Sequence, residues 1–128
     1  DVCSSDLSLT AEIRQMSNPM SIQSLPSTGD FQDHVSFGLN AARRTRDIHR
    51  NACYILAYEL ICACHAADIR GLDQASSATR KLHGLVRTKV PYLDHDEPLT
   101  DHIEAVAKMF RTGSLLEAIP DNVEGYNW

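Results

Sequence analysis

One long helical pattern, from about residue 31 to residue 68, constrains the fold more than any other feature. Apolar residues recur at three- and four-residue steps along its first half, with arginines at the other positions. Its second half, residues 52–67, is apolar on nearly every side, which is typical of a helix covered on every side. We find no strand pattern of comparable strength. The pattern therefore predicts an all-α chain.

The length of this helix predicts an assembly. About 38 residues at 1.5 Å per residue give a helix roughly 57 Å long. A compact globule of 128 residues has a diameter of roughly 35–40 Å. Unless the helix kinks, it is too long for a self-contained globule. We therefore expect it to belong to a bundle of long helices, followed by shorter C-terminal helices.

The other segments predict shorter elements. Residues 8–16 indicate the end of a helix that Thr10 caps and Asn18-Pro19 stops. Residues 17–30 form a predicted loop rich in Ser, Thr and Pro, and long loops of this kind are often functional. Gly71 is expected to end the long helix.

Two helices are predicted after Gly71. The first is capped by Ser76 or Ser77 and runs to about Thr88. The second is capped by Thr100 and ends at Gly113, with one more turn before Pro120. The helical region thus covers residues 8–120. Residues 121–128 form a polar tail for which we expect disorder.

Residues 1–7 fit none of these patterns. They resemble the peptide obtained when a common sequencing-library adapter is translated in frame. Our hypothesis is that this segment is not native; the alternative is a short native terminus. A natural coding sequence that runs through Cys3 would contradict the hypothesis.

Composition narrows the partners and the compartment. The chain carries 12 Lys and Arg against 17 Asp and Glu, and this net charge of −5 argues against a nucleic-acid-binding surface. We see no secretion signal and no uninterrupted apolar run of the roughly 18 residues that span a membrane. The four cysteines are interpreted as reduced thiols. We expect a cytoplasmic protein without membrane or nucleic-acid partners.

We predict no metal site. The chain has six histidines, but no two of them show the compact H-E-x-x-H spacing of a zinc site. His95-Asp96-Glu97 is better explained as a solvated acidic loop than as a weak metal site. Cys64 and His65 are neighbours on a helix and diverge, which argues against a nucleophilic pair.

Residues 30–34, at the predicted start of the long helix, have two interpretations. Asp30 is a good N-cap and Asp33 sits three positions later, as in a capping box, so both favour the positive end of the helix. The same end could also present Gln32, Asp33 and His34 to an anionic ligand. Chemistry alone favours simple capping.

A series of short motifs runs through most of the chain. The motifs are Asn18–Ile22, Ser24–Ser27, Gln32–Gly38, Ala41–Arg43, Ala57–Leu60, Ser77–Arg80, Val90–Asp94, Ile103–Glu104 and Gly113–Leu116. In this order they resemble the C-terminal part of the aromatic amino acid ammonia-lyases, which act on histidine, phenylalanine or tyrosine, and of the related aminomutases. The resemblance covers about residues 11–118, and the combination of motifs is specific although no single motif is.

The resemblance implies a homotetramer with a central bundle of long helices. It also implies elimination of ammonia from an aromatic amino acid to give an α,β-unsaturated acid. The electrophile of that family is a methylidene-imidazolone group formed from Ala-Ser-Gly. This chain contains no Ala-Ser-Gly and lacks the segment of the catalytic tyrosine. We therefore expect the chain to be the last quarter of such an enzyme, to hold no catalytic residue and to be inactive alone.

The resemblance assigns one site position. In histidine ammonia-lyases the motif usually contains Gln-Glu-Asp-His, and its Glu lies in the active site. Here Gln32 takes the place of the Glu and Phe31 that of the preceding Gln. An amide cannot pair with an imidazolium as a carboxylate does, so the substitution favours a neutral aromatic substrate. Gln32 and Phe31 are thus the expected substrate-binding residues, while Asp30, Asp33 and His34 cap the helix or support the site from behind.

Two functions stay open at this point. The first is the C-terminal region of an ammonia-lyase or aminomutase, and the second is a non-enzymatic helical oligomerisation module. An Ala-Ser-Gly upstream in the same reading frame would favour the first. The residues decide neither the particular aromatic amino acid nor elimination against amine migration.

Overall fold

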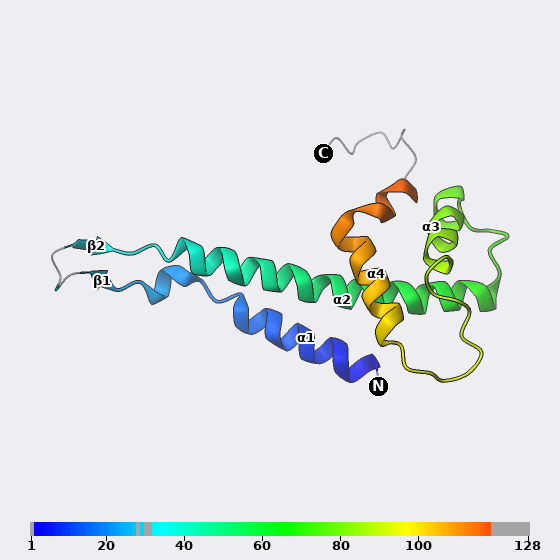
Figure 1. The fold of residues 1–128 in the computed structure, drawn as a ribbon, viewed down its shortest axis with the longest axis horizontal. Coiled ribbons are helices and arrows are strands. Elements are labelled where there is room, and N and C mark those ends of the chain that lie inside the picture. Colours follow the sequence, from blue (N-terminus) through cyan, green and yellow to red (C-terminus); the bar gives the residue numbers. More distant parts are fainter. Residues whose placement is uncertain (1, 28, 30–31, 119–128) are drawn as a thin grey trace. The chain divides into compact units, whose positions relative to one another are not determined.

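The computed structural model describes residues 2–27, 29 and 32–118. The helices are α1 (Val2–Met16), α2 (Gly38–Arg70), α3 (Ser77–Arg87) and α4 (Thr100–Thr112). Two 3-10 segments, η1 (Met20–Gln23) and η2 (Ser114–Ala118), and two short strands, β1 (Pro26–Ser27) and β2 (Gln32–His34), complete the elements. The all-α prediction is confirmed, with this small hairpin as an addition that the sequence pattern did not indicate (Figure 1).

The chain divides into two compact units, residues 1–52 and 53–128. Helix α2 is continuous across the boundary and contributes its first half to one unit and its second half to the other. Its 33 residues correspond to roughly 50 Å. The two units are described in turn.

Polar contacts hold the first unit together. The Asn51 side-chain amide on α2 donates to the Glu12 carboxylate on α1 over 2.9 Å. About two turns earlier on α2, Arg44 donates to the main-chain carbonyl of Asn18 over 3.2 Å. None of the described side chains of this unit is buried. The first half of α2 is therefore tied to α1 and to the start of the following loop without an apolar core.

The long helix begins later than predicted. It starts at Gly38, not near residue 31, because Gln32–His34 are in extended backbone paired with Pro26–Ser27. Phe37, directly before the helix, has a left-handed φ of +49° and its carbonyl accepts from the Ala41 amide over 3.0 Å. The predicted helix start near residue 31 is therefore wrong, and Asp33 lies in β2 rather than at a helix N-terminus. Asp30 and Phe31 lie outside the described residues, so the capping role of Asp30 stays a prediction.

Helix α1 and the end of α2 also differ in part from expectation. Helix α1 includes residues 2–7 and places Thr10 in its interior, so the predicted Thr10 cap is wrong. At the C-terminus of α1 the Ser17 amide donates to the Ile13 carbonyl over 3.0 Å, just before Asn18-Pro19. Helix α2 ends at Arg70, and Gly71 follows with φ +83°, a conformation that glycine adopts without strain. The glycine stop is confirmed.

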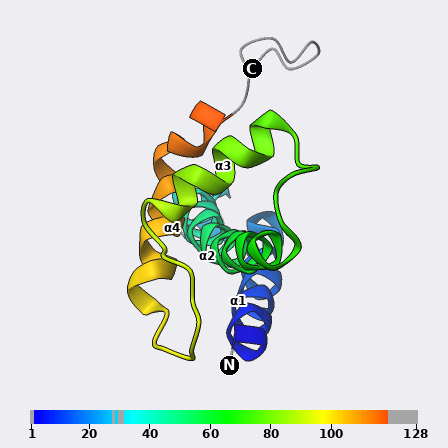
Figure 2. The ribbon, with the colours of Figure 1, turned by 90° about the vertical axis from the view of Figure 1, so that its right-hand side faces the viewer.

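The second unit has a small apolar core. Its centre is a stripe on α2 that faces α3, the segment after α3, and α4 (Figure 2). The partly buried Tyr54, Ile103, Phe110 and Leu115 extend it. The buried residues of this cluster are Cys53, Ala57, Ile61, Cys64, Val86, Val90, Val106 and Ala107.

The ends of α3 and α4 follow the predictions closely. The Ser76 hydroxyl accepts from the Thr79 amide over 3.1 Å, which confirms the Ser76 cap of α3. Thr100 is the first helical residue of α4, whereas its N-cap is Leu99, so the predicted Thr100 cap is wrong by one position. Gly113 ends α4 with φ +74°, and η2 supplies the predicted extra turn.

The second half of α2 is only partly covered. Cys53, Ala57, Ile61 and Cys64 are buried, but Leu56 is 42% exposed and Ala63 is exposed as well. By length and composition alone α2 is long and apolar enough to cross a membrane, contrary to the absence of such a segment expected from uninterrupted runs. A core helix of a soluble protein passes the same test. Part of the apolar surface of α2 is therefore exposed in this chain.

Candidate functional site

The site predicted from the sequence lies on a small antiparallel hairpin. Pro26 pairs with His34 and Ser27 with Gln32, so β2 carries one extra residue, Asp33, between two consecutive partners on β1. Such a bulge bends a strand locally. Pro26 has no N–H to donate, which suits a strand at an edge. The hairpin thus presents the Gln32–His34 segment on a short, locally bent strand.

A pair of hydrogen bonds closes the neck of this hairpin. The Ser24 hydroxyl donates to the Val35 carbonyl over 3.0 Å. In the opposite direction, the Val35 amide donates to the Leu25 carbonyl over 3.4 Å. We call this pair the Ser24–Val35 clasp. It joins the chain just before β1 to the chain just after β2.

A polar hollow of about 460 Å³ lies beside the clasp. It is lined by three serine side chains, one imidazole and one aliphatic side chain, from Ser21, Ser24, His34, Val35 and Ser36. Hydroxyls and an imidazole can donate and accept hydrogen bonds to a small polar ligand. Among the described residues, no group of three His, Cys, Asp or Glu side chains has the geometry of a metal site.

The structure brings only part of the predicted site together. His34 lines the hollow and is exposed. The backbone of Gln32 and Asp33 lies in β2, but their side chains, together with Asp30 and Phe31, lie outside what the structure describes. The substrate-binding roles of Gln32 and Phe31 therefore stay predictions.

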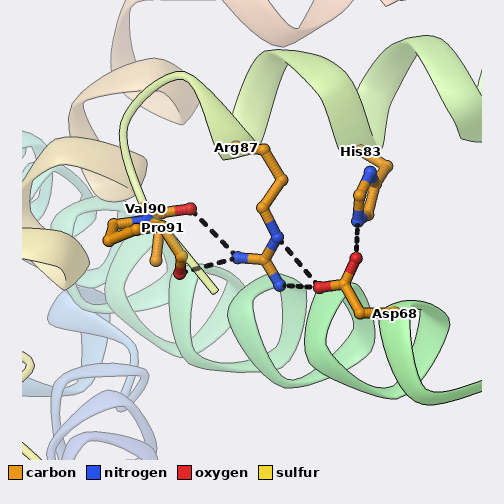
Figure 3. A network of polar contacts seen from close by, with 5 residues as sticks. All are labelled: Asp68, His83, Arg87, Val90 and Pro91. Atoms are coloured by element: carbon orange, nitrogen blue, oxygen red, sulfur yellow. Dashed lines mark hydrogen bonds and ion pairs between the residues drawn. The ribbon is translucent and has the colours of Figure 1, made fainter. Parts of the chain in front are cut away.

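Sequence reasoning missed a second polar centre, around Asp68 near the end of α2 (Figure 3). His83 Nε2 lies 2.7 Å from Asp68 Oδ1, and Arg87 Nε donates to Asp68 Oδ2 over 3.0 Å. A second nitrogen of the guanidinium, Nη2, contacts the same Oδ2. We call these three residues the Asp68 clamp. His83 and Arg87 are four residues apart on α3, a spacing that puts both side chains on one face of the helix. This spacing is the sequence signal that pointed to a polar cluster on α3.

The charges of the clamp set the protonation of its carboxyl. Burial by itself would raise the pKa of Asp68, but hydrogen bonds from Arg87 and His83, together with their positive charge, outweigh it and lower that pKa below its ordinary value. Nearby, burial raises the pKa of the Cys64 thiol, an effect that Arg87 opposes and Asp68 reinforces. Asp68 is therefore held ionised, and Cys64 is held as a thiol.

Arg87 also fixes the chain that follows α3. Its Nη1 donates to the carbonyls of Val90 and Pro91 over 3.0 and 3.2 Å (Figure 3). The next residue, Tyr92, stacks on the His65 ring with centroids 5.1 Å apart. The clamp thus joins α2, α3 and the segment after α3, which is a structural role and includes no group aimed at a ligand.

A second cavity of about 480 Å³ lies among α2, α3, α4 and η2. Its lining is almost wholly apolar and includes Leu60, Leu82, Met109, Phe110 and Leu115. Among the described residues that line it, none has an ionisable side chain, and Thr79 supplies a hydroxyl. Catalytic chemistry in this chain is therefore better sought at the hairpin.

Known proteins resemble the chain over nearly all of its length. Residues 5–88 match the family described as "Aromatic amino acid lyase". Tyrosine ammonia-lyase from Cupriavidus metallidurans is 48% identical over 112 residues, which are 87% of this chain and 21% of that protein. Histidine ammonia-lyase from Natranaerobius thermophilus is 38% identical over 116 residues, 91% of this chain and 23% of that protein.

A solved structure gives the same result for the fold. Phenylalanine aminomutase from Pantoea agglomerans is 53% identical and superposes with a TM-score of 0.78. The match covers 81% of this chain and 20% of the aminomutase chain. The chain spans about a fifth of the length of the curated relatives it matches. The family match, the identities and the shared fold agree with the resemblance of the Gln32–Gly38 motif. This chain belongs to the aromatic amino acid lyase family.

Proposed function

We propose that this chain is the C-terminal part of an ammonia-lyase that eliminates ammonia from an aromatic amino acid to give an α,β-unsaturated acid. The observation that carries the proposal is family membership over residues 5–88, a range that includes the hairpin and its Gln32. The ammonia-lyases and the aminomutase among the relatives support the class of substrate. Amine migration in place of elimination is the alternative within the same family.

The proposed substrate is phenylalanine or tyrosine. The relatives named for these two amino acids are 53% and 48% identical to the chain, compared with 38% for the histidine ammonia-lyase. Gln32 supports the same choice, because a neutral amide suits a neutral ring better than an imidazolium. The exposed His34 beside the hollow is a polar group near this position.

The chain on its own is proposed to be inactive. The resemblance implies a methylidene-imidazolone electrophile formed from Ala-Ser-Gly, and the printed residues contain no such tripeptide. The residues of this chain therefore do not fit the formation of the methylidene-imidazolone group. What this chain contributes is an edge of the substrate site, the hairpin, on a helical scaffold.

The proposed assembly is a cytoplasmic homotetramer in which copies of α2 cover one another. The exposed Leu56 and Ala63 on α2 support a helical partner, since residues on this face have no cover within the chain's own core. Light scattering of the chain is expected to show oligomers. A stable monomer, or a requirement for detergent to stay in solution, would contradict this assembly.

The substrate proposal is tested in the full-length protein with Gln32→Glu. A hydrogen bond to a charged group is worth about 1.5 kcal/mol more than one to a neutral group, so the ratio of kcat/KM for histidine over phenylalanine is expected to rise about tenfold. The measurement is ultraviolet detection of each unsaturated acid. Gln23→Glu, the same change at an exposed position of η1, is the control. An unchanged ratio would remove Gln32 from the substrate site.

A further inference from the structure

We infer that Ser24 is a positioning residue for substrate binding, because its clasp to Val35 fixes the hairpin strand that carries Gln32. The inference rests on the proposed function, in which Gln32 contacts the substrate. Ser24 itself is assigned no contact with substrate. It acts through the main chain of Val35, which lies three residues after Gln32.

The strand pairing of the hairpin is short. Its strands contain two and three residues, the pairing is interrupted at Asp33, and Pro26 supplies no N–H. Isolated two-stranded hairpins are marginally stable at best. Where the two arms meet, the clasp supplies two hydrogen bonds. One runs from the Ser24 hydroxyl to the Val35 carbonyl, and the other from the Val35 amide to the Leu25 carbonyl.

The position of the clasp makes Ser24 specific among the serines of the hollow. Ser21 and Ser36 line the same hollow, but Ser24 is the one whose hydroxyl bridges the two arms of the hairpin in the described part of the chain. Ser24 is half-buried and Ser21 is exposed. Loss of the Ser24 hydroxyl should therefore loosen β2, whereas loss of the Ser21 hydroxyl should not.

A matched pair of substitutions isolates the hydroxyl. Ser24→Thr and Ser24→Val have nearly the same shape, but only Thr keeps the donor. In the full-length protein, Ser24→Val is expected to raise KM for phenylalanine or tyrosine about fivefold with kcat changed less than twofold. Ser24→Thr should restore KM to within twofold, and Ser17→Ala, at an exposed serine outside the hollow whose hydroxyl donates to the Ile13 carbonyl, should leave it unchanged. Equal KM values for the Thr and Val variants would overturn the inference.

A double-mutant cycle tests whether Ser24 acts through Gln32. In a Gln32→Ala background, Ser24→Val is expected to change KM less than twofold. A fivefold rise in that background as well would overturn the positioning role. Hydrogen exchange of the amides around Val35 gives a readout independent of activity: faster exchange is expected in Ser24→Val and not in Ser24→Thr.

The two failures can be told apart. If Gln32→Ala changes KM and substrate preference while Ser24→Val does not, the positioning inference fails and the proposed role of Gln32 stands. If Gln32→Ala changes neither, the proposed substrate contact fails, and the positioning inference fails with it.

Discussion

The two units of the chain are held together by different physical means. Residues 53–118 pack α2, α3 and α4 around buried apolar side chains and add the Asp68 clamp at one end. In residues 1–52, none of the described side chains is buried, and hydrogen bonds such as Asn51–Glu12, Arg44–Asn18 and Ser24–Val35 join the segments. Local opening is cheapest where buried apolar contacts are few. The candidate site is thus on the weaker of the two units.

This difference suits the proposed roles of the two units. A scaffold helix needs a persistent core, whereas a loop that contacts substrate is commonly drawn from the less stable part of a protein. It also means that the first unit depends more on whatever covers it in the complete protein. Three predictions probe the difference, and all use urea unfolding of the full chain with helicity measured by circular dichroism.

The largest expected effect comes from two matched isoleucines. Ile61 on α2 is 4% exposed in the core, and Ile22 in η1 is 70% exposed. Ile61→Ala should lower the free energy of unfolding by about 3–4 kcal/mol, because it removes buried methyl groups and leaves a cavity. Ile22→Ala should change it by less than about 0.5 kcal/mol. Similar losses at both positions would show that the first unit has apolar cover in solution.

The next effect compares two arginines. Arg87 in the Asp68 clamp is 16% exposed, while Arg46 on the first half of α2 is 76% exposed and pairs with the adjacent Asp47 at 3.5 Å. Arg87→Ala should cost about 2–3 kcal/mol, since it leaves Asp68 Oδ2 and two carbonyls without the guanidinium donor. Arg46→Ala should cost under about 0.5 kcal/mol. Equal costs would contradict a structural role for the clamp.

The smallest expected effect is a decrease in the free energy of unfolding at low pH that arises in the second unit. Because the folded-state pKa of Asp68 is lowered, its contribution is complete above the unfolded-state pKa and is lost as pH falls through the folded-state value. The advantage of the native chain over Asp68→Asn should therefore shrink below about pH 4, by at most about 1.4 kcal/mol per pH unit, the limit for one proton.

Gln74→Ala, in the exposed turn after α2, is the control for this titration, because it removes no ionisable group. Its curve of unfolding free energy against pH should run parallel to that of the native chain. A curve for Asp68→Asn that also runs parallel would show that the clamp does not lower the pKa of Asp68 in solution.

Local signals predicted much of the fold. Gly71, Ser76 and Gly113 mark the ends of helices in the sequence, and each has that role in the structure. The apolar run 52–67 predicted which half of α2 contributes to the core, but not which face: Ala57 and Ile61 are buried, whereas Leu56 is exposed. These signals are short-range, since a cap or a left-handed glycine acts within one helical turn.

Non-local pairing explains what the sequence could not predict. Asp30 and Asp33 have the spacing of a helix start, but Gln32–His34 pair with Pro26–Ser27. The helix therefore begins only at Gly38. The Asp68 clamp joins residues 15 and 19 positions apart, so the spacing of His83 and Arg87 on one helix face did not identify Asp68 as their partner. At the site, the family motif indicated Gln32, whereas Ser24 became significant only when the structure brought it to Val35.

Because α2 is only partly covered, the cysteines along it differ in exposure and therefore in reactivity. Among the cysteines whose side chains the structure describes, Cys62 is exposed, while Cys53 and Cys64 are buried. Alkylating reagents attack the thiolate, and the raised pKa of Cys64, caused first by burial, slows attack there further. A maleimide dye would therefore attach to Cys62 in preference to the other two. Its uptake at Cys62, located by peptide mass spectrometry so that Cys3 is counted separately, would report whether another surface has closed over the outer face of α2.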